Sequence, residues 1–272
     1  MKGRTVLVTG GTDGIGKQTA LTLALMGASV IIHGRDPART AIAAAEIRAK
    51  TNSGAIETTV ADFSSLAQVR QCAADIKLRF PELHVLIHNA GVFMNERVVT
   101  VDGLEATLAI NHVAPFLLTH LLLDLLKKSA PARVISVSSI AHTRAKLDFG
   151  NLQWEKAFEG YGAYALSKLA NVLFTVELAR RLKGTGVTAN CLHPGVIATK
   201  LLQTGFGNVK ASPVGRGAGT SVYLASSPDV EGVTGKYFVH SQEAHASPVA
   251  EDAILCWTFW ETSEQLAGIA PS

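Results

Sequence analysis

The sequence predicts an α/β protein with a single domain (1–272), built on a doubly wound parallel sheet of about seven strands with helices on both faces. Three observations support this class. Short apolar runs alternate with helix-length segments, which is typical of βαβ units. A glycine-rich turn follows the first apolar run. With 272 residues, 47% of them hydrophobic, the chain is long and apolar enough to bury one large core.

Seven short runs are rich in β-branched and apolar residues, and turn-forming residues separate them. Their length and continuous apolar character suit the buried strands of a parallel sheet. The predicted strands are 5–9, 29–33, 55–60, 85–88, 133–137, 187–193 and 236–239.

Six longer segments between these strands predict helices. The second has a clear start, because Asp36 can cap a helix that has Pro37 at its first position. Small polar and glycine-rich stretches at 199–219 and 226–235 predict loops. The predicted helices are 15–26, 37–50, 64–80, 104–128, 161–183 and 215–225.

The first predicted strand is followed by glycines at the spacing of a dinucleotide-binding loop, and then by a helix. Gly10 permits a tight turn, Gly14 lets the backbone approach a phosphate, and Gly16 lets the helix lie close to the strand. Unpaired amides at the helix N-terminus would face the anion. A turn without a ligand is the alternative, but the flanking strand and helix favour a nucleotide site.

Tyr164 and Lys168 are four positions apart, so on a helix they share one face. A positive charge held beside a phenol can lower its pKa from about 10 toward neutrality and make it a proton donor and acceptor. An amphipathic surface helix explains the same spacing when it is taken alone. Tyr161 has no such partner, because Ala165 stands four positions further on.

Polar or glycine residues follow four more predicted strands at their carboxyl ends, where doubly wound sheets bind ligands. One such feature is ordinary turn chemistry. Four of them, together with the glycine loop, predict a single binding site. They are Asp62, Asn89-Ala90-Gly91, Ser138-Ser139 and His193-Pro194-Gly195-Val196.

Composition excludes several classes of protein. A net charge of +3 is too small and dispersed for nucleic acid binding. Three cysteines, without a CxxC pair, argue against a disulfide framework and for a reducing compartment. Strand-like sequence begins by Thr5, which leaves no room for a signal peptide, and the apolar stretch 21–32 is too short to span a bilayer. We therefore expect a cytoplasmic protein without a membrane span.

The histidines predict no metal site. His84 and His88 are four positions apart, but on a strand this spacing separates them by about 13 Å, so they cannot share an ion. His193, beside Pro194, is expected to be a hydrogen-bonding residue of a loop.

Over residues 2–239 the chain resembles the short-chain dehydrogenase/reductase family. The order of its motifs carries the resemblance, and the text around them is similar to the retinol-dehydrogenase-like branch, including 111–112, 137–142, 167–174, 193–196 and 235–238. The motifs are Thr9-Gly10-x-x-x-Gly14-x-Gly16, Asn89-Ala90-Gly91, Asn111, Ser139, Tyr164-x-x-x-Lys168 and Pro194-Gly195.

This resemblance implies a Rossmann-type oxidoreductase that transfers hydride between a nicotinamide and a carbonyl or alcohol carbon. Tyr164 would be the general acid or base. Lys168 would favour the phenolate and reach the nicotinamide ribose, and Ser139 would donate a hydrogen bond to the substrate oxygen. Asn111 would hold a water beneath Lys168 and continue a proton relay. Ser138 is the alternative to Ser139, because neighbouring strand residues face opposite ways.

The end of the second strand predicts NADP(H) rather than NAD(H). Asp36 lies at a distance from Gly16 that suits a ribose-binding acid, but it is better explained as a helix cap, and Gly34 stands where such an acid usually lies. Arg35 could then grip a 2′-phosphate, with a solvated surface charge as the alternative. Asp62 and Phe63 are expected to flank adenine, and Val196 and Thr199 to meet the carboxamide. The predicted cofactor-binding residues are Gly10, Thr12, Asp13, Gly14, Ile15, Gly16, Arg35, Asp62, Phe63, Asn89, Ala90, Gly91, Tyr164, Lys168, Pro194, Gly195, Val196 and Thr199.

Substrate loops are expected at about 140–160 and 197–215. Their bulky apolar residues could wall a pocket for a hydrophobic aldehyde, ketone or alcohol, or could simply be packing. A reductase of activated carbon–carbon double bonds and a catalytically silent NADP-sensing protein are the alternative functions. The candidate wall residues are Phe149, Leu152, Trp154, Phe158, Leu201, Leu202 and Phe206.

The leucine-rich stretch 117–126, interrupted by His120 and Asp124, predicts a helix buried on more than one face. Family members pair this helix and the helix at 161–183 with a second subunit. The resemblance thus implies a homo-oligomer, a dimer or tetramer, whereas leucines that only cover the sheet are the alternative.

Overall fold

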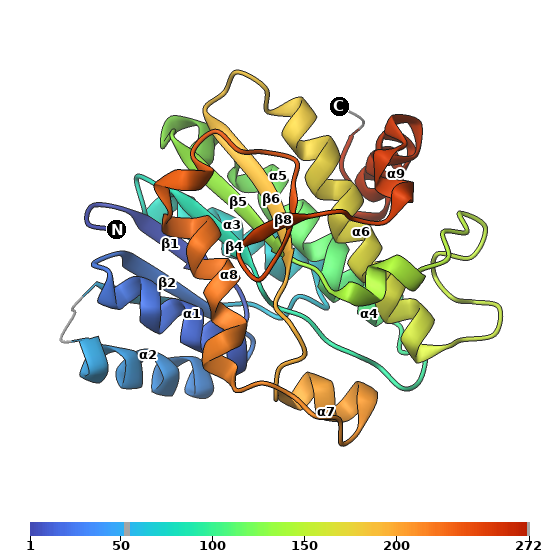
Figure 1. Cartoon of the computed structure of the whole chain (residues 1–272), viewed down its shortest axis with the longest axis horizontal. Coiled ribbons are helices and arrows are strands. Elements are labelled where there is room, and N and C mark those ends of the chain that lie inside the picture. The colour runs from blue at the N-terminus through green and yellow to red at the C-terminus, as the bar shows by residue number, and fades with distance from the viewer. Residues whose placement is uncertain (52–54, 271–272) are drawn as a thin grey trace.

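The structure is a computed structural model that describes residues 1–51 and 55–270, and one eight-stranded sheet organises this part of the chain. The strand order is β3-β2-β1-β4-β5-β6-β7-β8, and every neighbouring pair is parallel except β7 and β8. The predicted doubly wound fold is confirmed, with helices on both faces of the sheet (Figure 1). The strands are β1 (Thr5–Val8), β2 (Ser29–Gly34), β3 (Ile56–Val60), β4 (Val85–His88), β5 (Ala132–Val137), β6 (Val187–His193), β7 (Tyr237–Val239) and β8 (Gln242–Ala244).

Side-chain caps mark the start of several helices. Asp13 caps α1 by accepting a hydrogen bond from the Gly14 amide, and Ser65 caps α3 through the Gln68 amide. The helices and turns are α1 (Gly14–Leu25), α2 (Pro37–Thr51), α3 (Leu66–Arg79), α4 (Ala106–Leu108), the π-turn η1 (Ala109–Val113), α5 (Ala114–Lys128), the 3₁₀ turn η2 (Ile140–Arg144), α6 (Gly160–Arg181), α7 (Lys200–Phe206), α8 (Val214–Ser226), η3 (Pro228–Val230), η4 (Pro248–Glu251) and α9 (Ala253–Leu266).

The core has two layers because side chains alternate across the sheet. Leu7 of β1 and Ile31 of β2 are fully buried on the face covered by α3, α5, α6 and α9. Their neighbours Val6, Val8 and Ile32 are fully buried on the opposite face, under α1, α2 and α8. With both faces covered, the inner strands are continuous apolar runs, which explains why these runs could be recognised in the sequence.

The order of the strands reverses between β1 and β4. A crevice opens at such a switch point, outside the carboxyl ends of the two strands. The glycine loop follows β1, and residues 89–91 follow β4, so the chain brings both predicted motifs to this crevice.

Three elements differ from the sequence prediction. The predicted loop 199–219 contains the helix α7, while β8 and α9 lie in the part of the chain for which no element was predicted. β8 has only three residues, and α7 is a seven-residue helix with no buried side chain. Neither therefore shows the apolar periodicity on which the prediction depended.

The helical segment from Ala106 to Lys128 is long and apolar enough to cross a bilayer, by length and composition alone. In the fold, 83% of its most apolar window is buried. Leu117, Leu118 and Leu122 of α5 are fully buried in the core layer that includes α3 and α6. Packing against the sheet accounts for the apolar character of this helix.

Candidate functional site

A cleft of about 1070 Å³ lies at the carboxyl ends of the strands. It is lined by every predicted cofactor-binding residue, and by Ser139. Asn111 is the one predicted site residue that does not line it. The cleft thus unites the glycine loop with the tyrosine–lysine pair.

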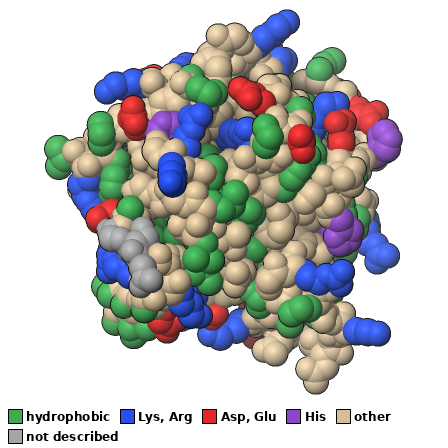
Figure 2. Space-filling view, turned by 60° about the vertical axis from the view of Figure 1, so that its left-hand side comes forward, with side chains coloured by type: hydrophobic (Ala, Val, Ile, Leu, Met, Phe, Trp, Pro, Cys, Tyr) green, Lys and Arg blue, Asp and Glu red, His purple; other side chains and the backbone are tan. Residues whose placement is uncertain are grey.

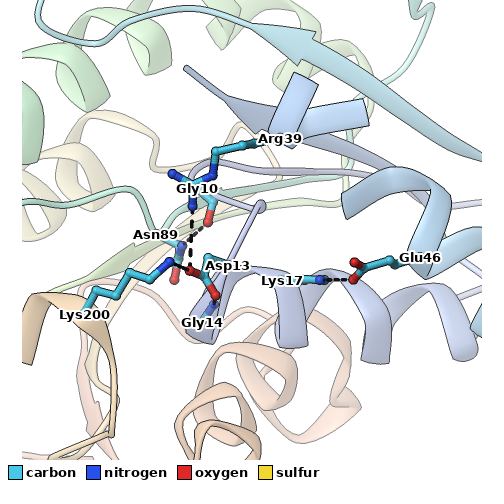
Figure 3. A network of polar contacts seen from close by, with 8 residues as sticks. All are labelled: Gly10, Asp13, Gly14, Lys17, Arg39, Glu46, Asn89 and Lys200. Atoms are coloured by element: carbon cyan, nitrogen blue, oxygen red, sulfur yellow. Dashed lines mark hydrogen bonds and ion pairs between the residues drawn. The ribbon is translucent and has the colours of Figure 1, made fainter. Parts of the chain in front are cut away.

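The glycine loop is shaped by close contacts that exclude larger residues. Gly10 has a φ of +63°, and a Cβ on Gly16 would come within 2.3 Å of the Gly10 carbonyl oxygen and of the Asn89 side chain. The Asn89 amide donates hydrogen bonds to the carbonyls of Thr9 and Gly10, at 2.9 and 3.2 Å. The backbone of the loop is therefore fixed by the residue that follows β4, as Figure 3 shows.

His33 of β2 supports the same loop through a hydrogen bond, a role that the sequence did not indicate. Its Nδ1 accepts a hydrogen bond from the Gly10 amide, its Nε2 lies 3.0 Å from the Ala61 carbonyl oxygen, and its ring stacks on Phe63 at 4.1 Å. Burial lowers the pKa of His33 to about 4, so the ring is neutral at pH 7. Phe63, expected beside adenine, also supports this histidine.

Charged side chains surround the loop where it enters α1 (Figure 3). Lys200 of α7 donates to Asp13 at 2.7 Å, and Arg39 of α2 lies 3.7 Å from the same carboxylate oxygen. The hydrogen bond from Lys200 lowers the pKa of Asp13, against a smaller effect of burial. Lys17 pairs with Glu46 across α1 and α2.

The end of β2 leaves no room for an acid. A Cβ at Gly34 would meet the hydroxyl of Thr40 at 2.3 Å and the methyl of Thr12 at 2.4 Å. Asp36 accepts a hydrogen bond from the Arg39 amide at 2.8 Å, so it caps α2 as predicted. Arg35 is exposed on the wall of the cleft.

Tyr164 and Lys168 lie on the buried side of α6, facing the end of β5. The Lys168 ammonium donates to the Val137 carbonyl at 3.0 Å and lies 5.6 Å from the centre of the Tyr164 ring. Ser138 donates to the Lys168 carbonyl at 2.7 Å and is buried, whereas Ser139 is half-buried at the cleft. Ser139 is thus the serine whose hydroxyl lies beside Tyr164.

Burial dominates the protonation of this pair. It raises the pKa of Tyr164 to about 12, although a hydrogen bond with Ser139 acts in the opposite direction. It also lowers the pKa of Lys168 to about 8. Both shifts disfavour the charged forms of the two side chains. The Tyr164 phenol is therefore protonated at pH 7 and is not a phenolate.

Asn111 lies in η1, between α4 and α5, and is buried behind the residues that line the cleft. Its side chain is paired with the backbone of Val92, accepting from the amide at 2.8 Å and donating to the carbonyl at 3.0 Å. It also donates to Ser167 at 2.9 Å. A Cβ on Gly91 would lie 3.4 Å from both the Asn111 oxygen and the Lys168 ammonium, so Asn111 and Lys168 border one backbone segment.

Aromatic rings cover the tyrosine end of the cleft. Phe93 and Phe206 lie 5.4 and 6.0 Å from the Tyr164 ring, and Tyr161 lies 5.9 Å from Phe206. Tyr161 therefore belongs to the site as a wall residue. Leu201, Leu202 and Phe206 line the cleft as expected.

The candidate wall residues of the earlier loop do not line the cleft. The ring centres of Phe149 and Phe259 of α9 are 6.2 Å apart, and Trp154 packs against Gly162 at the start of α6. Leu152 is 6% exposed within the core. Within 140–160, only Ile140 and Ala141 reach the cleft, because the rest of the loop packs against α9 and the start of α6.

Sequence reasoning missed Arg39 and Lys200, which line the cleft, and Phe93, which packs against the Tyr164 ring. Lys200 directly follows the predicted Thr199, and Arg39 lies in the first turn of the helix that Asp36 caps, so the predicted cap could have indicated Arg39. Phe93 carries no local signal. Among the described residues, no group of three or more metal-ligating side chains is close enough to hold an ion.

Comparisons with known proteins agree with this geometry. A family profile described as short chain dehydrogenase matches residues 4–208. Mouse (Mus musculus) retinol dehydrogenase 14 is 41% identical over 99% of this chain and 87% of its own length. Bovine (Bos taurus) retinol dehydrogenase 12 is 42% identical over 98% and 87%.

Solved structures have the same fold. A protein from Mycobacterium paratuberculosis aligns with a TM-score of 0.82 and 32% identity, over 100% of this chain and 96% of that one. A short chain dehydrogenase from Escherichia coli CFT073, complexed with NADPH, aligns with a TM-score of 0.73 and 26% identity, over 89% and 98%.

These relatives correct the prediction of a cytoplasmic location. Their names assign them to retinol, an apolar alcohol that partitions into membranes rather than water. The helix from Ala106 to Lys128 does not add to this correction, because the fold buries 83% of its most apolar window. The prediction is therefore wrong in confining the protein to the aqueous phase.

The cleft, the profile match and identity above 40% over nearly the whole chain lead to one conclusion. The chain belongs to the short chain dehydrogenase family, in which it is similar to the retinol dehydrogenases, and it is an oxidoreductase.

Proposed function

We propose that the protein is an NADP(H)-dependent oxidoreductase that interconverts a hydrophobic aldehyde or ketone and its alcohol. One observation carries the proposal: a buried phenol, a serine hydroxyl and a lysine meet at one end of a cleft whose other end is a glycine loop. The nicotinamide, when bound, would supply or accept the hydride.

The glycine loop fits a dinucleotide. Side chains at Gly10 or Gly16 would collide with neighbouring backbone, so the loop stays closely packed and the start of α1 faces the cleft. Lys168, Asn89 and Thr199 line the path from the loop to Tyr164. These residues would hold the cofactor along the carboxyl edge of the sheet.

Tyr164 would transfer the proton. With a pKa of about 12 the phenol is protonated at pH 7, which suits donation to the oxygen of a carbonyl as it becomes an alkoxide. Ser139 would position that oxygen by donating a hydrogen bond. Lys168 is held by the Val137 carbonyl and would stabilise the phenolate left after the proton has gone. Asn111 would support this step by fixing the Gly91–Val92 backbone, and the water predicted beneath Lys168 remains part of the proposal.

We expect Arg35→Glu to weaken NADPH binding by more than tenfold while NADH binding changes little or improves. Arg35 stands beside Gly34, where an acid does not fit, and Arg39 lines the same part of the cleft. A carboxylate at position 35 would replace attraction for the 2′-phosphate with repulsion. Dissociation constants from fluorescence titration with both cofactors measure the effect. Equal weakening of both would show that Arg35 is not the selector.

Substrate preference should follow chain length. Leu201, Leu202 and Phe206 line the tyrosine end of the cleft, so each methylene buried there should add up to about 0.8 kcal/mol of transition-state binding. We expect kcat/KM for straight-chain aldehydes to rise with each added carbon until the wall is filled. Measurement of NADPH consumption over such a series tests the proposed function and the apolar wall together.

A flat series with measurable turnover would contradict the apolar wall and leave carbonyl reduction intact. The reduction of activated double bonds is the second candidate, and the product formed from an enone separates the two, because carbonyl reduction gives an allylic alcohol and double-bond reduction a saturated ketone. A homo-oligomer remains a prediction, with Leu121 and Leu123 of α5 partly exposed.

A further inference from the structure

A second recess lies at the opposite edge of the sheet from the cofactor cleft. It has a volume of about 790 Å³ and is lined by the amino-terminal ends of β4, β5 and β6, by residues that precede β1, and by the carboxyl end of α6. This edge lies at the upper left of Figure 1. In Figure 2, where that side comes forward, Lys and Arg side chains gather on the upper part of the face, with Asp and Glu side chains around them.

The recess is lined by more cations than anions. Arg4, Arg133, Arg180 and Lys183 line it, and Glu231 is the one carboxylate among its described lining residues. Arg180 is already paired with Glu177, at 2.6 Å. The other three cations carry a charge of +3, and Glu231 offsets one of these charges, so the net formal charge of the recess is +2.

Two of the guanidinium groups are held in place without a carboxylate. Arg4 donates to the Pro131 carbonyl at 3.1 Å, and Arg133 donates to the Leu224 carbonyl at 2.8 Å. Within the described residues, neither lies within 4.0 Å of a carboxylate oxygen. Each guanidinium has five N–H donors in a planar fork, so donors remain after one carbonyl is bound.

The charge on Arg133 is costly in this position. Its side chain is half-buried, and burial lowers the pKa of its guanidinium, with a smaller opposing effect of Glu231 and a further lowering by Arg4. Two like charges in a recess raise the electrostatic potential there, and an anion between them would offset the cost.

The simpler explanation is that these arginines only satisfy exposed carbonyls. Arg70 has that role elsewhere, since it donates to the carbonyls of Ala267 and Gly268, and it does not line the recess. Arg4 and Arg133 differ from Arg70 because both line the same recess, together with Lys183.

We propose that this recess is a second binding site of the enzyme, specific for a phosphate group. A phosphate dianion matches the formal charge of +2, and its oxygens suit the paired N–H donors of arginine. The recess is much larger than one phosphate, so the group would be part of a larger molecule, either a soluble phosphorylated compound or a lipid headgroup.

Calorimetric titration of the full-length protein with inorganic pyrophosphate, at constant ionic strength, tests the site. Arg4→Gln and Lys183→Gln should each weaken this binding by at least about tenfold, because each removes a charge-assisted hydrogen bond. Both side chains lie at the rim, so these variants keep the protein measurable even if Arg133→Gln does not fold. Saturating NADPH should leave this binding unchanged, whereas pyrophosphate held in the cofactor cleft would be displaced.

Arg70→Gln is the matched control, since it also removes an arginine that donates to carbonyls, and it should bind pyrophosphate like the wild type. NADPH affinity should be the same in Arg4→Gln as in the wild type, which separates this proposal from the proposed function. The proposal is overturned if pyrophosphate does not bind, if binding survives both rim variants, or if Arg70→Gln weakens it equally.

Vesicles distinguish the two sources of the phosphate. Sedimentation with phosphatidylcholine vesicles that contain phosphatidic acid, but not with phosphatidylcholine alone, supports a lipid headgroup if Arg4→Gln abolishes it. Pyrophosphate binding that depends on Arg4, without sedimentation, supports a soluble phosphorylated ligand.

Discussion

Tyr164→Phe should lower turnover by at least about a hundredfold and leave NADPH affinity within about twofold of the wild type, because general acid catalysis contributes at least that factor. The substitution removes only the hydroxyl. Phe93 and Phe206 pack against the ring at 5.4 and 6.0 Å, and a phenylalanine keeps both contacts. Steady-state rates with a carbonyl substrate, together with NADPH titration, measure the two effects separately.

Tyr161→Phe provides the matched control, since Tyr161 shares the aromatic wall and lies 5.9 Å from Phe206. It should retain most of the wild-type turnover. Near-full activity of Tyr164→Phe, or an equal loss in both variants, would rule out the proton-transfer role of Tyr164.

The free energy of unfolding should fall steeply as the pH drops from about 6.5 toward 4. Burial lowers the pKa of His33, His112 and His193 to about 4 and that of His88 to about 3. Below pH 6.5 the unfolded chain binds protons that the folded protein does not, so stability decreases as pH falls. Each histidine contributes a slope of up to about 1.4 kcal/mol per pH unit, which adds up to about 6 for the four.

Such a slope is large compared with a typical total stability of about 5–15 kcal/mol. Urea unfolding measured between pH 7.5 and 4.5 gives the slope directly. His88→Gln should reduce the slope by about a quarter, whatever its effect on stability at pH 7.5. His120→Gln, at the partly exposed His120, is the matched control. Stability that is constant across this range would show that the buried rings take up protons in the folded state.

The catalytic and cofactor segments could be predicted because they combine local signals with fixed positions in the sheet. Gly10 and Asn89 each follow a buried apolar strand, Asp62 follows β3, and parallel strands place their carboxyl ends at one edge. The Tyr164 and Lys168 pair needed only the helical period. The location of these residues in one cleft follows from the βαβ pattern alone.

The substrate side could not be predicted in the same way. Phe149, Leu152 and Trp154 are as apolar as Leu201 and Phe206, and composition does not tell a cleft wall from a loop that packs on the fold. Phe149 packs against α9, and Trp154 packs against the start of α6. Helix α9 begins about a hundred residues later in the chain. Contacts of this kind depend on tertiary packing.

The charge network around Asp13 was missed for a related reason. Lys200 and Arg39 reach it from α7 and α2, and both look like ordinary solvated cations in the sequence. His33 is similar, since its hydrogen bonds to the Gly10 amide and the Ala61 carbonyl join β2 to the segments that follow β1 and β3, which only the sheet brings together.

The crowding around Gly34 limits how this protein could be redesigned to use the other nicotinamide cofactor. An aspartate placed at position 34 would have to displace both Thr12 and Thr40, whose side chains lie within 2.4 Å of the added carbon. A single exchange there would disturb the glycine loop and the first turn of α2 before it could select a ribose. Engineering of cofactor preference in this scaffold should therefore start at Arg35 and Arg39, where side chains change without a cost in packing.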